Sequence, residues 1–290
     1  MKLATYQKEA KEEIGFVLGD RIYPLKQFGI HFETMNQLIE YMSYKQLSQL
    51  VFSQEAKMSW ELKEVQLQAP IPCPRQDIIC LGMNYATHAE ESARYKKEDF
   101  FYNKNHAVYF SKRVNRATAP FEVIDHHFTL DQDLDYECEL AIIIGQDCRH
   151  VKKEQVWDVI FGYTILNDIT ARSVQTHHKQ WYFGKSFDMF APMGPWIVTA
   201  DEFGKEPTFH LECRVNGEIR QQMSTDLLIF DIAHIISELS QGMTLLAGTI
   251  IATGTPSGVG MGFNPPRFLQ SQDCIECTIS EIGTLVNKIK

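Results

Sequence analysis

The sequence predicts an α+β fold in which strands dominate, and two observations support this. Apolar runs of strand length outnumber segments with a helical repeat, and the turns between them are rich in glycine. The chain has 290 residues, of which 44% are hydrophobic and 22% are charged. This composition is that of a globular protein with a sizeable core, and it excludes disordered and fibrous classes.

A proline-rich segment at residues 69–74 predicts a boundary between two domains, because alternate prolines interrupt any regular element there. Residues 1–70 contain short amphipathic pieces, and they hold no cluster of potential ligands or catalytic groups. We therefore expect a small N-terminal domain of unassigned role over residues 1–70. Residues 71–290 are expected to form a second, larger domain that carries the candidate functional residues.

The second part of the chain alternates strand patterns with two helical ones. The expected strands are residues 77–82, 134–145, 161–167, 196–199, 210–215, 249–253 and 273–279. A short helix is expected over 152–160, and a longer one should begin after the N-cap residue Asp231 and stop at Gly242. The apolar run from Leu140 to Ile144 indicates a strand that is buried on both faces.

The charge balance and the cysteines bear on partners and compartment. Acidic residues number 37 against 28 Lys and Arg, so the net charge is −9, which disfavours nucleic acid and anionic membranes as partners. The pair Lys96-Lys97 is too short for a basic patch and is expected to lie on a solvated face. Seven scattered cysteines indicate reduced thiols. With no apolar signal region or membrane span, we expect a soluble cytoplasmic protein.

Three acidic residues lie on one face of the strand expected at 134–145. Side chains two apart share a face of a strand, so Asp135, Glu137 and Glu139 should point the same way. Such carboxylates repel one another unless water or a cation neutralises them. They could lie on a solvated edge, but the strand continues into the apolar run that ends at Ile144. Burial of this kind favours a metal.

A further carboxylate, Asp168, ends the strand expected at 161–167. The short helix between the two strands makes a unit that could bring them side by side. Glu137, Glu139 and Asp168 would then supply three hard oxygen ligands, which suit Mg²⁺ or Mn²⁺. Alternatively, Asp168 could be the N-cap of the segment that follows it.

Two other positions could carry catalytic groups. If the chain is helical from residue 87, His88 and Glu91 lie three residues apart on one face, and the carboxylate could orient the imidazole as a general base acting on water. A plain surface pair is the alternative. Lys185 lies among aromatic residues and could bind a carboxylate or stabilise an enolate, or it could extend from an apolar patch to water.

The loop at residues 253–260 ends a strand and is rich in glycine, so its backbone could approach a ligand closely. It lacks the Gly-Lys-Ser/Thr signature of a phosphate loop. Cys274 and Cys277 lie in an alternating strand that turns them to opposite faces, which disfavours a zinc site. No dinucleotide-binding fingerprint follows a strand.

Taken together, these segments resemble the fumarylacetoacetate hydrolase superfamily. The likeness covers nearly everything from about residue 72 onward, and the motifs occur in the order of that family. The matching segments are 82–91, 135–145, 162–175, 185–199, 215–221 and 242–260. Residues 260–269 further resemble bacterial members related to oxaloacetate decarboxylases. The resemblance implies a β-dominated mixed-sheet roll and a homodimer.

The resemblance also implies roles for individual residues. The implied set is Glu137, Glu139 and Asp168 for one divalent cation, His88, Glu91 and Lys185 for catalysis, and Arg172, Gln175 and Thr255 for substrate contacts. The metal ligands agree with those derived from the strand pattern. At Ser173, Met189 and Thr249 the sequence departs from the usual pattern of the family, without removing a metal ligand.

The resulting hypothesis is a Mg²⁺- or Mn²⁺-dependent enzyme that cleaves a C–C bond next to a small 2-oxo acid. The metal and Lys185 would stabilise a pyruvate enolate. Water activated by His88 and Glu91 would make the reaction an acylpyruvate-type hydrolysis, and departure of CO₂ would make it an oxaloacetate-type decarboxylation. The alternatives are an isomerase or hydratase of unsaturated oxo-dicarboxylates in aromatic catabolism, and a non-catalytic metabolite-binding protein.

Overall fold

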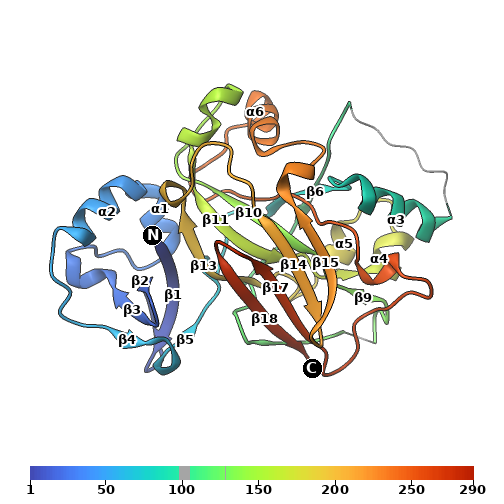
Figure 1. The fold of residues 1–290 in the computed structure, drawn as a ribbon, viewed down its shortest axis with the longest axis horizontal. Helices are drawn as coiled ribbons and strands as arrows, with labels where there is room; N and C mark the ends of the chain where they lie inside the picture. Colours follow the sequence, from blue (N-terminus) through green and yellow to red (C-terminus); the bar gives the residue numbers. More distant parts are fainter. Residues whose placement is uncertain (98–104, 128) are drawn as a thin grey trace.

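The computed structural model describes residues 1–97, 105–127 and 129–290, and its largest element is one mixed sheet (Figure 1). Within the described residues this sheet has eleven strands. In spatial order they are β4 (Trp60–Glu61), β3 (Arg21–Pro24), β2 (Lys11–Leu18), β1 (Lys2–Lys8), β13 (Met193–Thr199), β11 (Ile160–Asn167), β10 (Cys138–Ile144), β16 (Ile250–Ala252), β6 (Ile78–Gly82) and β7 (Val108–Lys112), with β5 (Gln66–Leu67) on β1. The pairing is antiparallel except between β16 and β6.

A second sheet packs across the first. Its strands, in spatial order, are β15 (Glu218–Ser224), β14 (His210–Val215), β17 (Cys274–Ile279), β18 (Gly283–Ile289) and β8 (Val123–Ile124). A short pair is formed by β9 (Leu134–Asp135) and β12 (Thr170–Ala171). The expected strand-dominated α+β fold is confirmed.

Six α-helices in the described residues cover the ends and edges of these sheets. They are α1 (Met35–Tyr41), α2 (Tyr44–Phe52), α3 (Ala86–Lys96), α4 (Arg172–His177), α5 (Tyr182–Lys185) and α6 (Ile232–Gly242). Figure 1 shows α3, α4 and α5 together at one end of the molecule, with β1 to β3 and α2 at the opposite end. As expected from the sequence, α6 ends at Gly242, and the Asp231 carboxylate caps it by accepting the His234 N–H at 2.6 Å.

The core explains the apolar run in β10. Leu140 and Ile142 face a cluster shared with β14, β17 and α6, whereas Ala141 and Ile143 face a cluster that includes α1. Every residue of β10 is buried, so the prediction of burial on both faces is confirmed.

The strand expected at 196–199 begins earlier, at Met193, and two further elements differ in continuity or type. The strand expected at 134–145 is not continuous, because β9 pairs with β12 while β10 begins only at Cys138 and pairs with β11. The Asp135 carboxylate accepts the backbone N–H of Tyr136 at 2.9 Å, which turns the chain out of the ladder at that point. The helix expected at 152–160 is a shorter 3₁₀ helix, Lys153–Asp158.

The first part of the chain extends the large sheet. β1 pairs with β13 through Lys2 opposite Val198 and Leu3 opposite Ile197. The sheet is therefore continuous across residues 69–74, and the division into two domains at this point stays a prediction.

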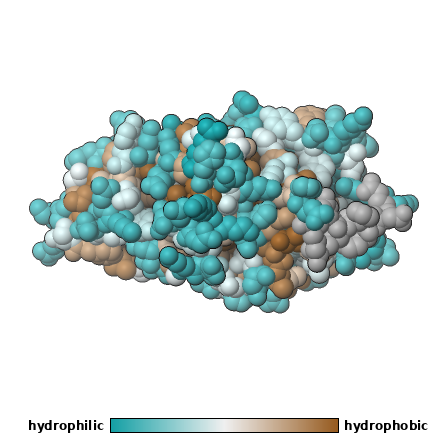
Figure 2. Space-filling model, turned by 90° about the horizontal axis from the view of Figure 1, so that it is seen from above, coloured by the Kyte–Doolittle hydropathy of each residue, from teal (hydrophilic) through white to brown (hydrophobic). Residues whose placement is uncertain are grey.

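The outer face seen in Figure 2 is mostly hydrophilic, with hydrophobic residues in small groups between the polar ones. Within residues 1–97, 105–127 and 129–290, no helix combines the length and the apolar character needed to cross a bilayer.

Candidate active site

Three buried carboxylates meet where β10 and β11 pair. Glu137 precedes β10, Glu139 lies on it, and Asp168 follows β11 directly. Cys138 lies opposite Asn167, and the Asp168 N–H donates to the Glu137 carbonyl at 2.8 Å, which brings the strand ends together. One carboxylate oxygen of each acidic residue lies within 4.8 Å of the others. The expectation that these two strands are neighbours is confirmed.

Lys185 bridges two of these carboxylates. Its Nζ lies 2.6 Å from Glu137 Oε2 and 2.6 Å from Asp168 Oδ2. The side chain is 2% exposed, so the alternative that it extends to water is wrong. Burial acts to lower the pKa of Lys185, but Asp168 and Glu137 outweigh burial and raise this pKa above its ordinary value. Lys185 is therefore a fixed cation beside the acidic residues.

Glu139 differs from the other two carboxylates in its partners. Its Oε2 accepts the Gly254 N–H at 2.9 Å, and it forms no ion pair with any residue that the structure describes. Burial, followed by the charges of Asp168 and Glu137, raises the pKa of Glu139 well above its ordinary value. A divalent cation among the three carboxylates would give Glu139 a partner of opposite charge. An all-oxygen donor set of this kind fits Mg²⁺ or Mn²⁺.

Arg172, the first residue of α4, holds the other side of Glu137. Its Nε lies 2.8 Å from Asp135 Oδ2, and its terminal nitrogen Nη2 lies 2.7 Å from Glu137 Oε1. Asp135 also accepts the backbone N–H groups of Gly260 and Met261, at 2.6 and 3.1 Å. Asp135 therefore lies outside the three-carboxylate cluster and instead ties Arg172 to the glycine loop.

The predicted pair His88 and Glu91 lies on the helix α3. His88 Nδ1 is 3.7 Å from Glu91 Oε2, an ion-pair distance that is too long for a hydrogen bond. Both oxygens of Glu91 lie 3.0 Å from the Gly258 nitrogen. Gly258 has φ +101°, and a Cβ there would lie 1.8 Å from the Arg220 carbonyl oxygen, so only glycine fits. Glu91 thus fixes α3 to the loop at 253–260.

The hydroxyl group of Thr255, in the same loop, both accepts and donates a hydrogen bond. Its Oγ1 accepts from Gln221 Nε2 at 2.7 Å and donates to the Cys138 carbonyl at 3.1 Å. Gln221, on β15, also donates to the Pro256 carbonyl at 2.8 Å. These bonds hold the loop against the start of β10.

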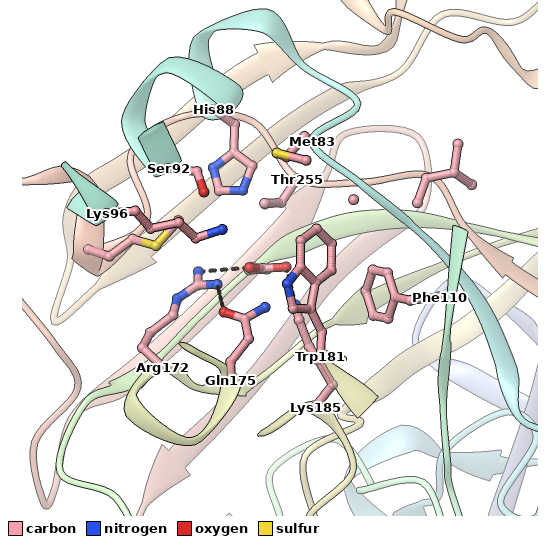
Figure 3. Close-up of a pocket in the computed structure, with 14 residues that line it drawn as sticks. Met83, His88, Ser92, Lys96, Phe110, Arg172, Gln175, Trp181, Lys185 and Thr255 are labelled. Atoms are coloured by element: carbon pink, nitrogen blue, oxygen red, sulfur yellow. Dashed lines mark hydrogen bonds and ion pairs between the residues drawn. The ribbon is translucent and has the colours of Figure 1, made fainter. Parts of the chain in front are cut away.

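A cavity joins these groups (Figure 3). Its lining residues are Leu81, Gly82, Met83, His88, Ser92, Lys96, Phe110, Glu137, Arg172, Gln175, Trp181, Lys185, Thr255 and Met261. Six of the nine predicted site residues are among them; Glu91, Glu139 and Asp168 are not, although Glu139 and Asp168 adjoin Glu137. In Figure 3 the His88 ring points into the cavity from α3, opposite Arg172 and Gln175.

Two lysines at this site are not among the site residues predicted from the sequence. Lys112, at the end of β7, is buried with its Nζ 2.6 Å from Asp168 Oδ1. Lys96 was expected on a solvated face, but it is half-buried and lines the cavity, whereas Lys97 is exposed. The signal for Lys96 was its spacing of eight residues, or two steps of four, from His88 on a helix.

Gly82 gives the Trp181 ring its place in the cavity wall. A Cβ on Gly82 would lie 2.1 Å from Trp181 Cζ3. We expect Gly82→Ala to lower the free energy of unfolding by about 1–3 kcal/mol, the usual cost of overpacking, and to lower kcat/KM as the ring moves. Urea unfolding and steady-state kinetics measure both. Gly204→Ala is the matched control, because a Cβ there meets nothing within 4 Å, and equal effects of the two variants would contradict this role.

A strand-rich fold with a buried cluster of three carboxylates and a fixed lysine beside a cavity defines a class of enzymes whose site suits a divalent cation. The model of the fumarylacetoacetate (FAA) hydrolase C-terminal family matches residues 77–290, and the chain belongs to this family. The resemblance seen in the sequence is thereby confirmed.

Individual relatives and solved structures show which members of the family this chain is similar to. The chain is 47% identical over 230 residues to oxaloacetate tautomerase YisK of Bacillus subtilis (strain 168), covering 79% of this chain and 75% of that relative. Its structure is similar to fumarylacetoacetate hydrolase EaFAH from Exiguobacterium antarcticum, with TM-score 0.83, 38% identity and coverage of 100% and 99% of the two chains. It is also similar to maleylpyruvate hydrolase from Sphingobium sp. SYK-6 in complex with manganese(II) ion and pyruvate, with TM-score 0.78, 30% identity and coverage of 100% and 98%.

Proposed function

We propose that this protein is a divalent-cation-dependent tautomerase that interconverts the keto and enol forms of a small 2-oxo dicarboxylate such as oxaloacetate. One observation carries the proposal: Glu137, Lys185 and Arg172 line one cavity, with Glu139 and Asp168 adjoining Glu137. Such a site suits a ligand that presents 2-oxo and carboxylate oxygens. The 47% identity to an oxaloacetate tautomerase supports the choice of reaction within the family.

Glu137, Glu139 and Asp168 are the residues that would hold the cation, Mg²⁺ or Mn²⁺. When bound, such a cation supplies Lewis-acid polarisation of the 2-oxo group, which makes the neighbouring C3–H bond more acidic. The charged Lys185, held by Glu137 and Asp168, and the charged Arg172, held by Asp135, add fixed positive charge where negative charge develops on the substrate oxygen. Because the charged side chains of Lys185 and Arg172 are already positioned, they need no reorganisation during the reaction.

The proton transfer falls to His88. Tautomerisation moves one proton between C3 and the 2-oxo oxygen, so no water is consumed and no carbon–carbon bond breaks. Nδ1 of His88 faces Glu91 at 3.7 Å, which leaves Nε2 as the atom to accept the C3 proton and return it to the oxygen. Glu91, fixed by the Gly258 N–H, orients the ring for this transfer.

The test starts from enol-oxaloacetate in the presence of malate dehydrogenase and NADH, because the coupling enzyme consumes only the keto form. With Mn²⁺, the protein should accelerate NADH oxidation, and a chelator should abolish the effect. Pyruvate, measured separately, should stay at its uncatalysed level. An unchanged rate of ketonisation with metal present would refute the tautomerase proposal.

His88→Asn tests the assigned proton carrier. We expect kcat for ketonisation to fall about 10²-fold or more, the usual contribution of a general base. The rise in melting temperature on adding Mn²⁺ should persist, because His88 belongs to α3 and not to the carboxylate cluster. A variant with kcat near that of the wild type would assign the proton to another group.

Cleavage of a C–C bond is the second candidate. The similarity to maleylpyruvate hydrolase in complex with manganese(II) ion and pyruvate favours it, since a cation held by the same carboxylates, together with Lys185, would stabilise a pyruvate enolate. Hydrolysis would additionally need His88 to activate water. Acetylpyruvate gives acetate and pyruvate by this route, and oxaloacetate gives CO₂ and pyruvate by decarboxylation. Metal-dependent formation of pyruvate from either substrate would favour cleavage over tautomerisation.

We also propose a homodimer, on the strength of the family resemblance. Size-exclusion chromatography with light scattering should give twice the mass of one chain. A mass equal to that of one chain would contradict it.

A further inference from the structure

Lys96 is positioned to contact a ligand in the cavity. It is the last residue of α3, four residues beyond Ser92 and eight beyond His88, so the three side chains lie along one helix face. All three line the cavity. In Figure 3 Lys96 extends from α3 into the cavity and in this view ends between His88 and Arg172.

The charge of Lys96 is not neutralised by any residue that the structure describes. Three side chains of Lys and Arg line the cavity, and two of them are engaged: Arg172 by Asp135 and Glu137, and Lys185 by Glu137 and Asp168. Lys96 forms no ion pair with a residue in the described part of the chain.

An aromatic ring holds Lys96 at the cavity without cancelling its charge. Its Nζ lies 5.6 Å from the centroid of the Trp181 ring, within the range of a cation–π contact. Trp181 is itself packed edge-on against Phe110, with ring centroids 5.3 Å apart, and occupies the space that Gly82 leaves open. The ammonium group is thus held at the wall formed by α3 and Trp181, apart from the buried carboxylates.

We infer that Lys96 binds the substrate carboxylate that lies farther from the metal ligands, and thereby selects dicarboxylates over monocarboxylates. This rests on the proposed function, in which the 2-oxo acid end of the substrate faces Glu137 and Lys185. A second carboxylate that extends toward α3 meets the one lysine of the lining that has no carboxylate partner among the described residues. Because Lys96 is half-buried, water screens this pair less than it screens a surface pair.

Binding of two unreactive ligands tests the inference apart from turnover. Malate and lactate both present a 2-hydroxy acid, and malate adds only the distal carboxylate. Isothermal titration of the Mn²⁺-loaded protein should show malate binding roughly 10–100-fold more tightly than lactate, the range expected for a hydrogen bond to a charged group. In Lys96→Met, malate affinity should fall to that of lactate, and lactate affinity should not change.

Two matched variants separate local contact from general charge. Lys97→Met removes the same charge from the exposed neighbouring residue and should keep the preference for malate. Lys96→Arg retains a cation and should keep part of the preference. Loss of malate preference in Lys97→Met would mean that the overall field, and not Lys96, sets it.

Three further results would overturn the inference about Lys96, and a fourth would separate it from the proposed function. A malate preference that survives in Lys96→Met overturns the inference, as does wild-type protein that binds the two ligands equally. An equal loss of lactate binding in Lys96→Met would overturn it as well, because the lysine would then support the cavity as a whole. Protein that fails to tautomerise oxaloacetate but shows the Lys96-dependent preference would refute the proposed function and keep this inference.

Discussion

Replacing Glu139 by glutamine should abolish divalent-cation binding and the proposed activity while leaving the metal-free protein as stable as the wild type or more so. Glu139 is 1% exposed, and burial with the charges of Asp168 and Glu137 raises its pKa. Glutamine keeps the shape and cannot carry the negative charge that burial and the neighbouring carboxylates disfavour at this position. Without the third anionic ligand, the Mn²⁺-induced rise in melting temperature should disappear, and kcat/KM should fall by about 10³-fold or more, equivalent to several kcal/mol of Lewis-acid stabilisation.

Glu137→Gln is the matched comparison, because it removes a carboxylate whose charge is compensated. Burial acts to raise the pKa of Glu137, but Lys185 and Arg172 outweigh burial and lower this pKa to about 2. Glutamine would leave two buried cations short of a partner, which costs about 3–5 kcal/mol of unfolding free energy. The two variants should therefore lose activity alike and differ in stability. If Glu139→Gln keeps its Mn²⁺-induced shift in melting temperature, the cation binds elsewhere.

The acidic cluster was predictable because its signal is local. Alternation along a strand placed Glu137 and Glu139 on one face, and the apolar run that follows them indicated burial. Asp168 required only that two strands joined by a short helix be neighbours, and β10 and β11 do pair. The break before Cys138 was not predictable in this way, because the Asp135 carboxylate that accepts the Tyr136 N–H is also held by the N–H groups of residues 260 and 261, far along the chain.

Residues whose role depends on long-range contacts have no comparable signal in the local sequence. Gln221 lies in the second sheet and donates a hydrogen bond to Thr255 in the glycine loop. An isolated glutamine in an alternating segment gives no sequence signal for such a contact. A pair of lysines at the end of a helix is usually solvated, so the helical spacing of Lys96 from His88 becomes informative only once His88 is known to face a cavity. Periodicity indicates which face a residue occupies, but it does not indicate what lies opposite that face.

Lys112 is the clearest case, and its replacement should produce a large loss of stability. Its side chain is fully buried, with Nζ 2.6 Å from Asp168 Oδ1 and 3.1 Å from the Ile169 carbonyl, and it also donates to the Lys185 carbonyl. Burial lowers the pKa of Lys112 even though Asp168 opposes this. Methionine fills similar space but leaves two carbonyls and Asp168 without this donor. We expect Lys112→Met to lose about 3–5 kcal/mol of unfolding free energy in urea titrations.

The free energy of unfolding of Lys112→Met should also increase when metal is added. The size of this increase distinguishes a role of Lys112 at the acidic cluster from simple packing. Among the described residues, Asp168 in Lys112→Met retains only Lys185 as a cationic partner, so added Mn²⁺ should recover more stability in this variant than in the wild type. Lys63→Met, at a lysine whose side chain is 82% exposed and paired with Glu61, should change the free energy of unfolding by less than about 1 kcal/mol. If Lys112→Met matches Lys63→Met in stability, the buried pair with Asp168 contributes nothing net to the fold. If it is destabilised but gains no more from Mn²⁺ than the wild type, Lys112 holds the carbonyls of Ile169 and Lys185 and does not balance the charge of Asp168.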